Sequence, residues 1–148
     1  MPLTSDEAIA DVLRSVKTIA LLGASHKPQR PSYRVMQFLL SHDYQVVPVN
    51  PGLSGTDLLG QRVYGSLAEV PCPIDMVDVF RNASHLPAIV DDTIGLGIGT
   101  LWTQLDVIDR AAAMRAESHG VRVIMDRCPA IEWPRLQAAG RLRTSQPD

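Results

Sequence analysis

The stretch "TIALLGASHKPQRPSYR", residues 18–34, decides how the rest of the chain is interpreted. Residues 18–22 are β-branched or aliphatic, and they are apolar on both faces, as strands of parallel sheets are. Gly23 then allows the backbone to turn sharply out of the strand, and Ser32 can cap a helix that follows. A strand, a glycine turn and a helix in this order can present helix amides to an anion.

The same alternation of strand and helix continues along the chain. Four more apolar runs predict strands: "YQVVPVNP" at 44–51, "MVDVFR" at 76–81, "GTLWTQ" at 99–104 and "VRVIMD" at 121–126. Helical spacing predicts helices over about 5–16, 32–42, 83–94, 107–118 and 131–139, the first beginning with the capping-box pattern of Thr4 and Glu7. Residues 52–69 are expected to form a surface connection that is either irregular throughout or contains one turn of helix. The pattern predicts an α/β three-layer sandwich of about five parallel strands with helices on both faces.

Length and composition limit the classes of protein that this chain can belong to. Its 148 residues predict one domain, 1–148, with an ordered core over about 5–139 and a frayed tail at 140–148. A formal net charge of −2 gives no general attraction to nucleic acid or to an anionic membrane. No signal-peptide or membrane-span pattern is present, so a cytoplasmic protein is expected. Two cysteines and four histidines show no metal-ligand spacing, and no metal site is predicted.

The predicted topology indicates where a ligand would bind. In open parallel sheets, ligands lie outside the carboxyl ends of the strands, where the strand order reverses. The residues that follow the predicted strands are therefore expected at one rim: Gly23 to Tyr33, Asn50, Pro51, Phe80, Arg81, Thr103, Gln104, Asp126, Arg127 and Cys128.

The glycine loop indicates which anion this rim holds. Of a dinucleotide fingerprint G-x-G-x-x-G only Gly23 is present, so a glycine needed merely to leave the strand remains an alternative. Lys27 and Arg30 lie in the loop and can both reach a phosphate. Asn50 stands where NAD-binding domains place a carboxylate for the ribose, and it would not repel a phosphorylated ribose. Together these residues favour coenzyme A (CoA) or NADP over NAD.

Six short motifs resemble one family. They are "IALLGAS" with its basic, proline-containing loop, "VVPVNP", "GQRVYGSLAEVP", "IDMVDVFR", "LWTQL" and "MDRCP", and they cover about residues 17–136. The chain resembles the small stand-alone CoA-binding proteins, which are related to the N-terminal CoA-binding domain of the succinyl-CoA synthetase α subunit. The resemblance implies a Rossmann-like fold that binds CoA through its adenosine diphosphate part.

The resemblance also implies roles for residues of this chain. Gly23, Ala24 and Ser25 would wrap the pyrophosphate, with Lys27 and Arg30 as phosphate partners. Asn50 and Pro51 would border the adenosine, and Phe80 and Arg81 would flank the nucleotide. One departure is Asp106, where these proteins often have glycine after "QL".

Other residues near the rim leave two interpretations open. Cys128, beside Arg127 that would lower its pKa, either lines the pocket or supplies thiol chemistry with CoA. Gln104 and Tyr33 either reach the ligand or pack. Asp75 and Asp78 would lie on opposite faces of a strand and are expected to be structural.

These observations predict that the chain binds CoA or a short acyl-CoA as a binding, carrier or regulatory module without chemistry of its own. The chain lacks the phosphohistidine domain and the ATP-grasp partner of succinyl-CoA synthetase-like enzymes, so no catalytic residue is assigned. The alternatives are an NADP-binding oxidoreductase component and a thiol-dependent CoA enzyme using Cys128. Homodimer formation is left open.

Overall fold

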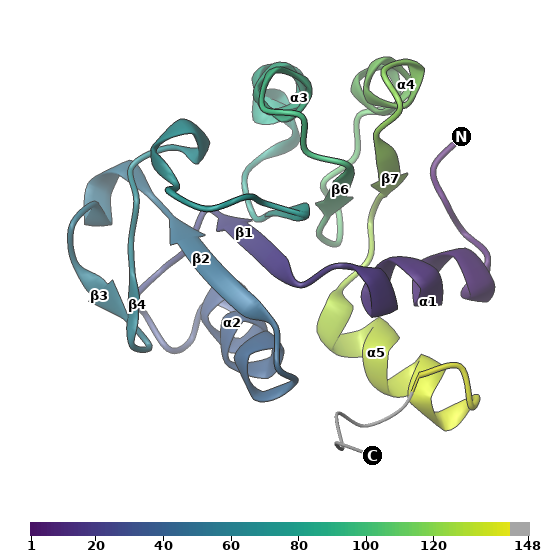
Figure 1. Cartoon of the computed structure of the whole chain (residues 1–148), viewed down its shortest axis with the longest axis horizontal. Coiled ribbons are helices and arrows are strands. Elements are labelled where there is room, and N and C mark those ends of the chain that lie inside the picture. Colours follow the sequence, from purple (N-terminus) through teal and green to yellow (C-terminus); the bar gives the residue numbers. More distant parts are fainter. Residues whose placement is uncertain (143–148) are drawn as a thin grey trace.

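The computed structural model describes residues 1–142 and has a five-stranded parallel sheet at its centre (Figure 1). The strand order is β2-β1-β5-β6-β7. The strands are β1 (Thr18–Leu22), β2 (Gln45–Val49), β5 (Met76–Val79), β6 (Thr100–Thr103) and β7 (Arg122–Ile124). After β2 the chain crosses over to the other side of β1, so the strand order reverses between β1 and β5.

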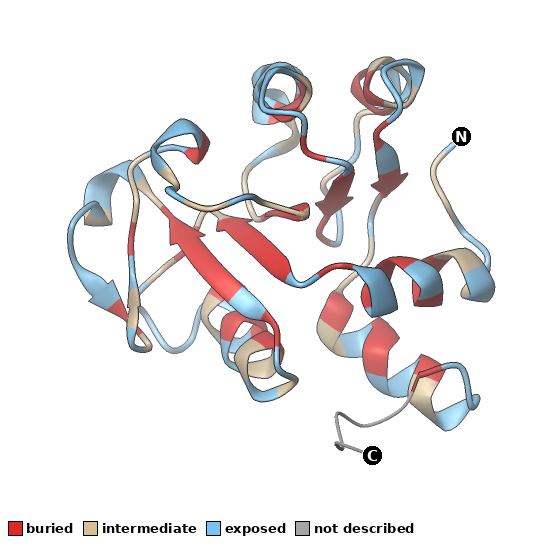
Figure 2. Cartoon of the chain, in the orientation of Figure 1, coloured by how far each residue is buried: buried red, intermediate tan, exposed pale blue. Residues whose placement is uncertain are grey.

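Helices cover both faces of this sheet and confirm the three-layer, Rossmann-like prediction. Helices α1 (Asp6–Ser15), α2 (Pro31–Ser41) and α5 (Pro129–Ala138) lie on one face, and α3 (Leu86–Gly95) and α4 (Arg110–Ser118) lie on the other. The strands are almost entirely buried between them (Figure 2). This burial explains why the strand sequences are apolar on both faces.

Two apolar layers, one on each side of the sheet, form the core. Ile19, Met36 and Trp102 are fully buried in the layer under α1, α2 and α5. Val77 and Leu101 are fully buried in the layer under α3 and α4. Each fully buried aliphatic side chain stabilises the fold by about 1.5–3 kcal/mol relative to leaving it exposed.

The connection between β2 and β5 is more ordered than the sequence predicts. It contains the 3₁₀ turns η1 (Pro51–Leu53) and η2 (Leu67–Glu69) and an antiparallel hairpin of β3 (Asp57–Leu58) and β4 (Gln61–Arg62). Tyr64 pairs with Val49 at the outer edge of β2, which holds the connection beside the carboxyl rim. A third 3₁₀ turn, η3 (Ala83–His85), directly precedes α3.

Several predicted helix starts are wrong by one to three residues. Ser5, not Thr4, caps α1 by accepting a hydrogen bond from the Ala8 amide. Ser32 lies inside α2, whose cap position is Arg30 and whose first helical residue is Pro31. Proline suits this position because its φ already matches the helix and it has no N–H group that needs a partner. The predicted helix 107–118 begins only at Arg110 because Asp109 caps it.

The ordered part of the chain extends beyond the predicted core of 5–139 at both ends. The Leu3 amide donates to the Val123 carbonyl at the edge of β7, and Leu142 is buried against the core. The tail predicted to fray, 140–148, thus includes three residues that the structure describes; residues 143–148 lie outside the described part. No helix within residues 1–142 is long and apolar enough to cross a bilayer.

Candidate functional site

The carboxyl ends of β1 and β5 come together where the strand order reverses, and Gly23 lies at that point. Its φ of +92° is a conformation that favours glycine. A Cβ added there would lie 3.0 Å from the carbonyl oxygen of Phe80 and 3.2 Å from Cδ of Arg81. The residue must therefore be glycine both for its turn and for the close approach of the β5 loop.

Asn50 holds the loop that follows Gly23. Its side-chain Nδ2 donates to the Ala24 carbonyl at 2.7 Å, and its Oδ1 accepts from the Gly52 amide at 2.8 Å. The amides of Gly23 and Ala24 both donate to the Val49 carbonyl, at 3.0 and 3.3 Å. These two amides are thus occupied in positioning the loop, so phosphate donors are to be sought from Ser25 onward.

A cavity of about 380 Å³ opens at this point. It is lined by Gly23, Ala24, Ser25, Lys27, Arg30, Pro31, Ser32, Asn50, Phe80 and Arg81. The amides of Ser25 and Ser32 have no hydrogen-bond partner within residues 1–142, and the side chains of Lys27 and Arg30 form no ion pair there. A free amide in the loop after β1, a free amide in the first turn of α2 and two exposed cations make this cavity suited to a phosphate group.

A second cavity of about 230 Å³ adjoins the first through Arg81, which lines both. Its apolar walls include Leu22, Leu67 and Ile89, and Pro51 lies at its edge. Ser66, His85 and Asp92 supply its polar side chains, and Arg81 Nη2 lies 3.2 Å from His85 Nε2. These three polar residues were not predicted from the sequence. Only the "GQRVYGSLAEVP" motif indicated that the connection between β2 and β5 belongs to the site.

Most of the predicted site residues line one of these two cavities. Tyr33, Gln104 and Cys128 line neither of these two cavities. Tyr33 and Cys128 are half-buried and pack against the core layer under α2 and α5, together with Phe80. Trp102 is fully buried, as predicted.

Gln104 is buried and hydrogen bonds Asp78. Gln104 Nε2 donates to Asp78 Oδ1 at 2.6 Å, and Asp78 Oδ2 has no partner among the described residues. Burial raises the pKa of Asp78 to about 7, although the bond from Gln104 opposes the rise. Asp75 lies just before β5 and accepts hydrogen bonds from the amides of Lys17 and Thr18, which is the structural role expected for it.

Arg127 does not activate Cys128, which corrects the expectation from the sequence. Arg127 instead pairs with Glu132 at 3.0 Å. Burial raises the pKa of the Cys128 thiol, and the charges of Asp78 and Glu132 raise it further, whereas the amides of Ala130 and Ile131 lower it. The thiol is therefore less ionised at neutral pH than a free cysteine.

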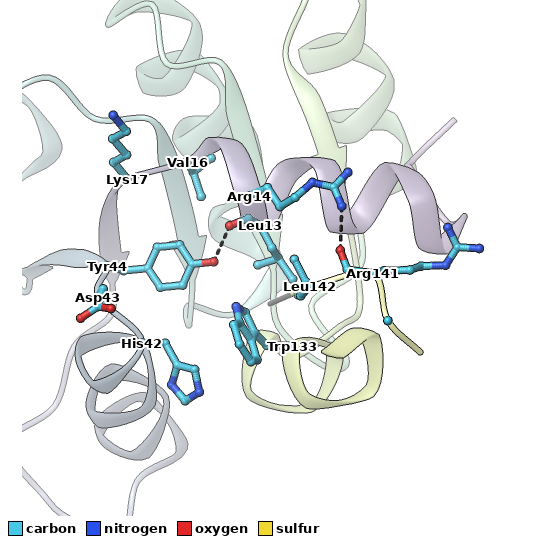
Figure 3. Close-up of a pocket in the computed structure, with 11 residues that line it drawn as sticks. Leu13, Arg14, Val16, Lys17, His42, Asp43, Tyr44, Trp133, Arg141 and Leu142 are labelled. Atoms are coloured by element: carbon cyan, nitrogen blue, oxygen red, sulfur yellow. Dashed lines mark hydrogen bonds between the residues drawn. The ribbon is translucent and has the colours of Figure 1, made fainter. Parts of the chain in front are cut away.

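A larger cavity, about 640 Å³, lies at the opposite rim, between α1, the α2–β2 turn and the end of α5 (Figure 3). Tyr44 and Trp133 form its aromatic wall, and the Tyr44 hydroxyl donates to the Leu13 carbonyl. Figure 3 shows the side chains of Lys17 and Arg141 directed away from this wall. The cavity lies at the amino ends of the strands, whereas open parallel sheets bind ligands at the carboxyl ends, so we do not assign the nucleotide site to it.

The fold and the carboxyl-rim cavities define a doubly wound α/β protein with a glycine turn after its first strand, at the point where the strand order reverses. Over residues 17–134 the chain matches the CoA binding domain family, and it belongs to that family. This membership supports a CoA-binding module and confirms the resemblance seen in the sequence.

Similar proteins agree with this assignment. YneT of Bacillus subtilis (strain 168) is 32% identical over 84% of this chain and 90% of its own length. A hypothetical protein from Pyrococcus horikoshii OT3 has 35% identity and a TM-score of 0.86, covering 93% of this chain and 96% of that one. The acetate–CoA ligase (ADP-forming) I subunit alpha of Pyrococcus furiosus is 25% identical over 77% of this chain but only 28% of its own length. The chain thus spans about a quarter of the ligase subunit.

Proposed function

We propose that this protein binds CoA or a short acyl-CoA through its nucleotide part and acts as a binding, carrier or regulatory module. The observation that carries the proposal is the cavity at the β1–β5 switch point, which is lined by two amides and two cations that have no partner among residues 1–142. In a chain with a formal net charge of −2, such a local cluster of donors is specific for an anion rather than a general attraction.

The two adjoining cavities suit the two ends of the ADP part. Phosphate groups would meet the amides of Ser25 and Ser32 and the side chains of Lys27 and Arg30. The adenosine would occupy the neighbouring cavity against Ile89, with Ser66, His85 and Asp92 as hydrogen-bonding partners. Arg81 borders both cavities and is proposed to contact the ligand where adenosine and phosphate join.

The module is proposed to bind its ligand without catalysing a reaction on it. The thiol of Cys128 has a raised pKa, and the nearby carboxylate of Asp78 is buried. Neither group has the arrangement of an activated nucleophile with a general base. A carrier or regulator needs only recognition, which the cavity residues provide.

Calorimetric titration of the purified protein with CoA, dephospho-CoA and NADPH tests the proposal. We expect micromolar binding of CoA and weaker binding of dephospho-CoA, which lacks the ribose phosphate. Binding of NADPH without binding of CoA would replace the proposal with the oxidoreductase alternative. Binding of none of the three would mean that Gly23 serves only as a turn.

A further inference from the structure

Cys128 lies where the carboxyl rim continues beyond the two cavities. The 230 Å³ cavity opens on the α3 side of the sheet, and the 380 Å³ cavity lies over the ends of β1 and β5. Cys128 directly precedes α5, on the opposite face from α3. Across the rim, the proposed adenosine cavity therefore comes first, the proposed phosphate cavity second and the thiol of Cys128 third.

The backbone before Cys128 is fixed over β6. The Arg127 amide donates to the Thr103 carbonyl at 3.1 Å, and Trp102 Nε1 donates to the Arg127 carbonyl at 2.7 Å. These bonds bring the thiol back from the edge strand β7 toward the centre of the rim. From β6 to β1 are two strand spacings, roughly 10 Å, which the flexible pantetheine arm of CoA spans.

A second polar group near the thiol is the carboxyl group of Asp78, one oxygen of which has no hydrogen-bond partner among the described residues. Asp78 lies in register with Leu21 of β1 and Trp102 of β6, on the sheet face that α2 and α5 cover. It is fully buried, Oδ2 has no hydrogen-bond partner among the described residues, and its charge acts on Cys128. A buried carboxylate oxygen without a partner is uncommon and suggests a group that arrives from outside the chain.

We propose that Cys128 forms a mixed disulfide with the thiol end of the coenzyme, an inference that rests on the proposed CoA site. The co-reactant is the disulfide of CoA. The Cys128 thiolate attacks one sulfur of this disulfide, and a bond forms between Sγ and that sulfur. The original sulfur–sulfur bond breaks, its electron pair leaves with the second CoA as a thiolate, and the proton of Cys128 passes to solvent. The disulfide is exchanged and there is no net oxidation.

The environment of Cys128 makes this reaction selective. A raised pKa leaves little thiolate at neutral pH, so disulfides that merely diffuse past react slowly. A disulfide held by its nucleotide in the adjoining cavity is present at a high effective concentration, which compensates for the scarce thiolate. Selectivity thus comes from the nucleotide site and not from an intrinsically reactive cysteine.

Cys72 provides an internal control for this inference. It lies between Pro71 and Pro73 before β5, at the amino rim, where Gln45 Nε2 is 4.0 Å from its sulfur. It is half-buried, like Cys128, but it is remote from the glycine loop. A general thiol reaction would modify both cysteines, whereas a reaction templated by the nucleotide would modify only Cys128.

The test is intact-mass and peptide mass spectrometry of the full chain incubated with CoA disulfide or with pantethine, which carries the same disulfide without nucleotide. We expect one CoA adduct on Cys128, formed at least about tenfold faster than the pantethine adduct. The adduct should persist in Cys72→Ser and disappear in Cys128→Ser. In Lys27→Ala, the labelling rate with CoA disulfide should fall toward that with pantethine.

Equal rates with the two disulfides, or equal labelling of Cys72, would overturn the inference. Calorimetry with reduced CoA separates this failure from failure of the proposed function. CoA binding without a Cys128 adduct would refute the disulfide and leave the CoA site intact. Absence of both binding and adduct would refute both proposals.

Discussion

The two rims of the sheet differ in what their cavities contain. The cavity at the amino rim is larger, about 640 Å³, but its aromatic wall of Tyr44 and Trp133 is already packed and hydrogen bonded. The cavity at the carboxyl rim is about 380 Å³, yet it is lined by amides and cations that have no partner in the described part of the chain. Polar groups that line one cavity without partners therefore identify a site better than volume does.

The largest expected effect comes from the amino rim and concerns stability alone. Trp133 is 4% exposed, so Trp133→Ala should lower the free energy of unfolding by about 3–5 kcal/mol. Because the residue is remote from the glycine loop, the CoA affinity of the folded variant should not change. Urea unfolding and calorimetry measure the two quantities, with exposed Met114→Ala as a control that changes neither. Loss of CoA affinity in folded Trp133→Ala would contradict the assignment of CoA binding to the carboxyl rim alone.

The pH dependence of stability should distinguish the buried polar groups of the two rims. Burial raises the pKa of Tyr44 to about 12, so Tyr44 stays neutral between pH 4 and 8. Asp78, with a pKa of about 7, is protonated in the folded protein while the unfolded chain already ionises near pH 4. The unfolded state therefore binds fewer protons, and stability falls as pH rises from about 4 to 7.

Asp78→Asn removes this pH dependence. Between pH 4 and 8 the original protein should lose up to about 4 kcal/mol of unfolding free energy relative to the variant. The variant should therefore gain in relative stability as the pH rises. Tyr44→Phe should give a difference that is independent of pH over the same range. Urea unfolding at several pH values provides the measurement, and a constant difference for Asp78→Asn would contradict the assigned pKa.

Gly23→Ala should damage the carboxyl rim directly. The positive φ and the 3.0 Å approach to the Phe80 carbonyl together cost about 2–3 kcal/mol, and the displaced loop should bind CoA more than tenfold more weakly. Gly97→Ala is the matched control at the amino rim, with φ of +69° and nothing within 4 Å of an added Cβ. It should cost about 1 kcal/mol and leave affinity unchanged. Unaltered CoA binding in Gly23→Ala would remove the loop from the site.

Single removal of either cation should have the smallest effect. Lys27→Ala and Arg30→Ala should each weaken CoA binding roughly tenfold, because each loses one charge-assisted contact with phosphate. The affinity of both variants should also depend less on salt concentration. Lys17→Ala, an exposed cation at the amino rim, is the control and should bind CoA normally. Calorimetry at two salt concentrations checks the result.

The sequence predicted the sheet and its helices because each element carries its own local pattern. The run at 18–22 is apolar on both faces, and the strand at 76–79 is equally distinctive. The hairpin β3–β4 escaped prediction because strands of two residues have no periodicity to detect. The start of α2 was misplaced because Pro31, not Ser32, determines where that helix begins.

The candidate site was less predictable because its key contacts join distant parts of the chain. The loop cations and Gly23 could be found from their place after a strand. The bond between Asp78 and Gln104 spans 26 residues, and no local pattern indicates it. The pairing of Arg127 with Glu132, which leaves Cys128 without an activating cation, likewise depends on side-chain orientation.

The most direct test of the two-rim account is a map of backbone amide chemical shifts during titration with CoA. We predict that the largest changes occur at Ser25, Lys27 and Arg81, with little change at Tyr44 and Trp133. Changes centred on Tyr44 and Trp133 instead would place the nucleotide in the larger cavity and contradict the account.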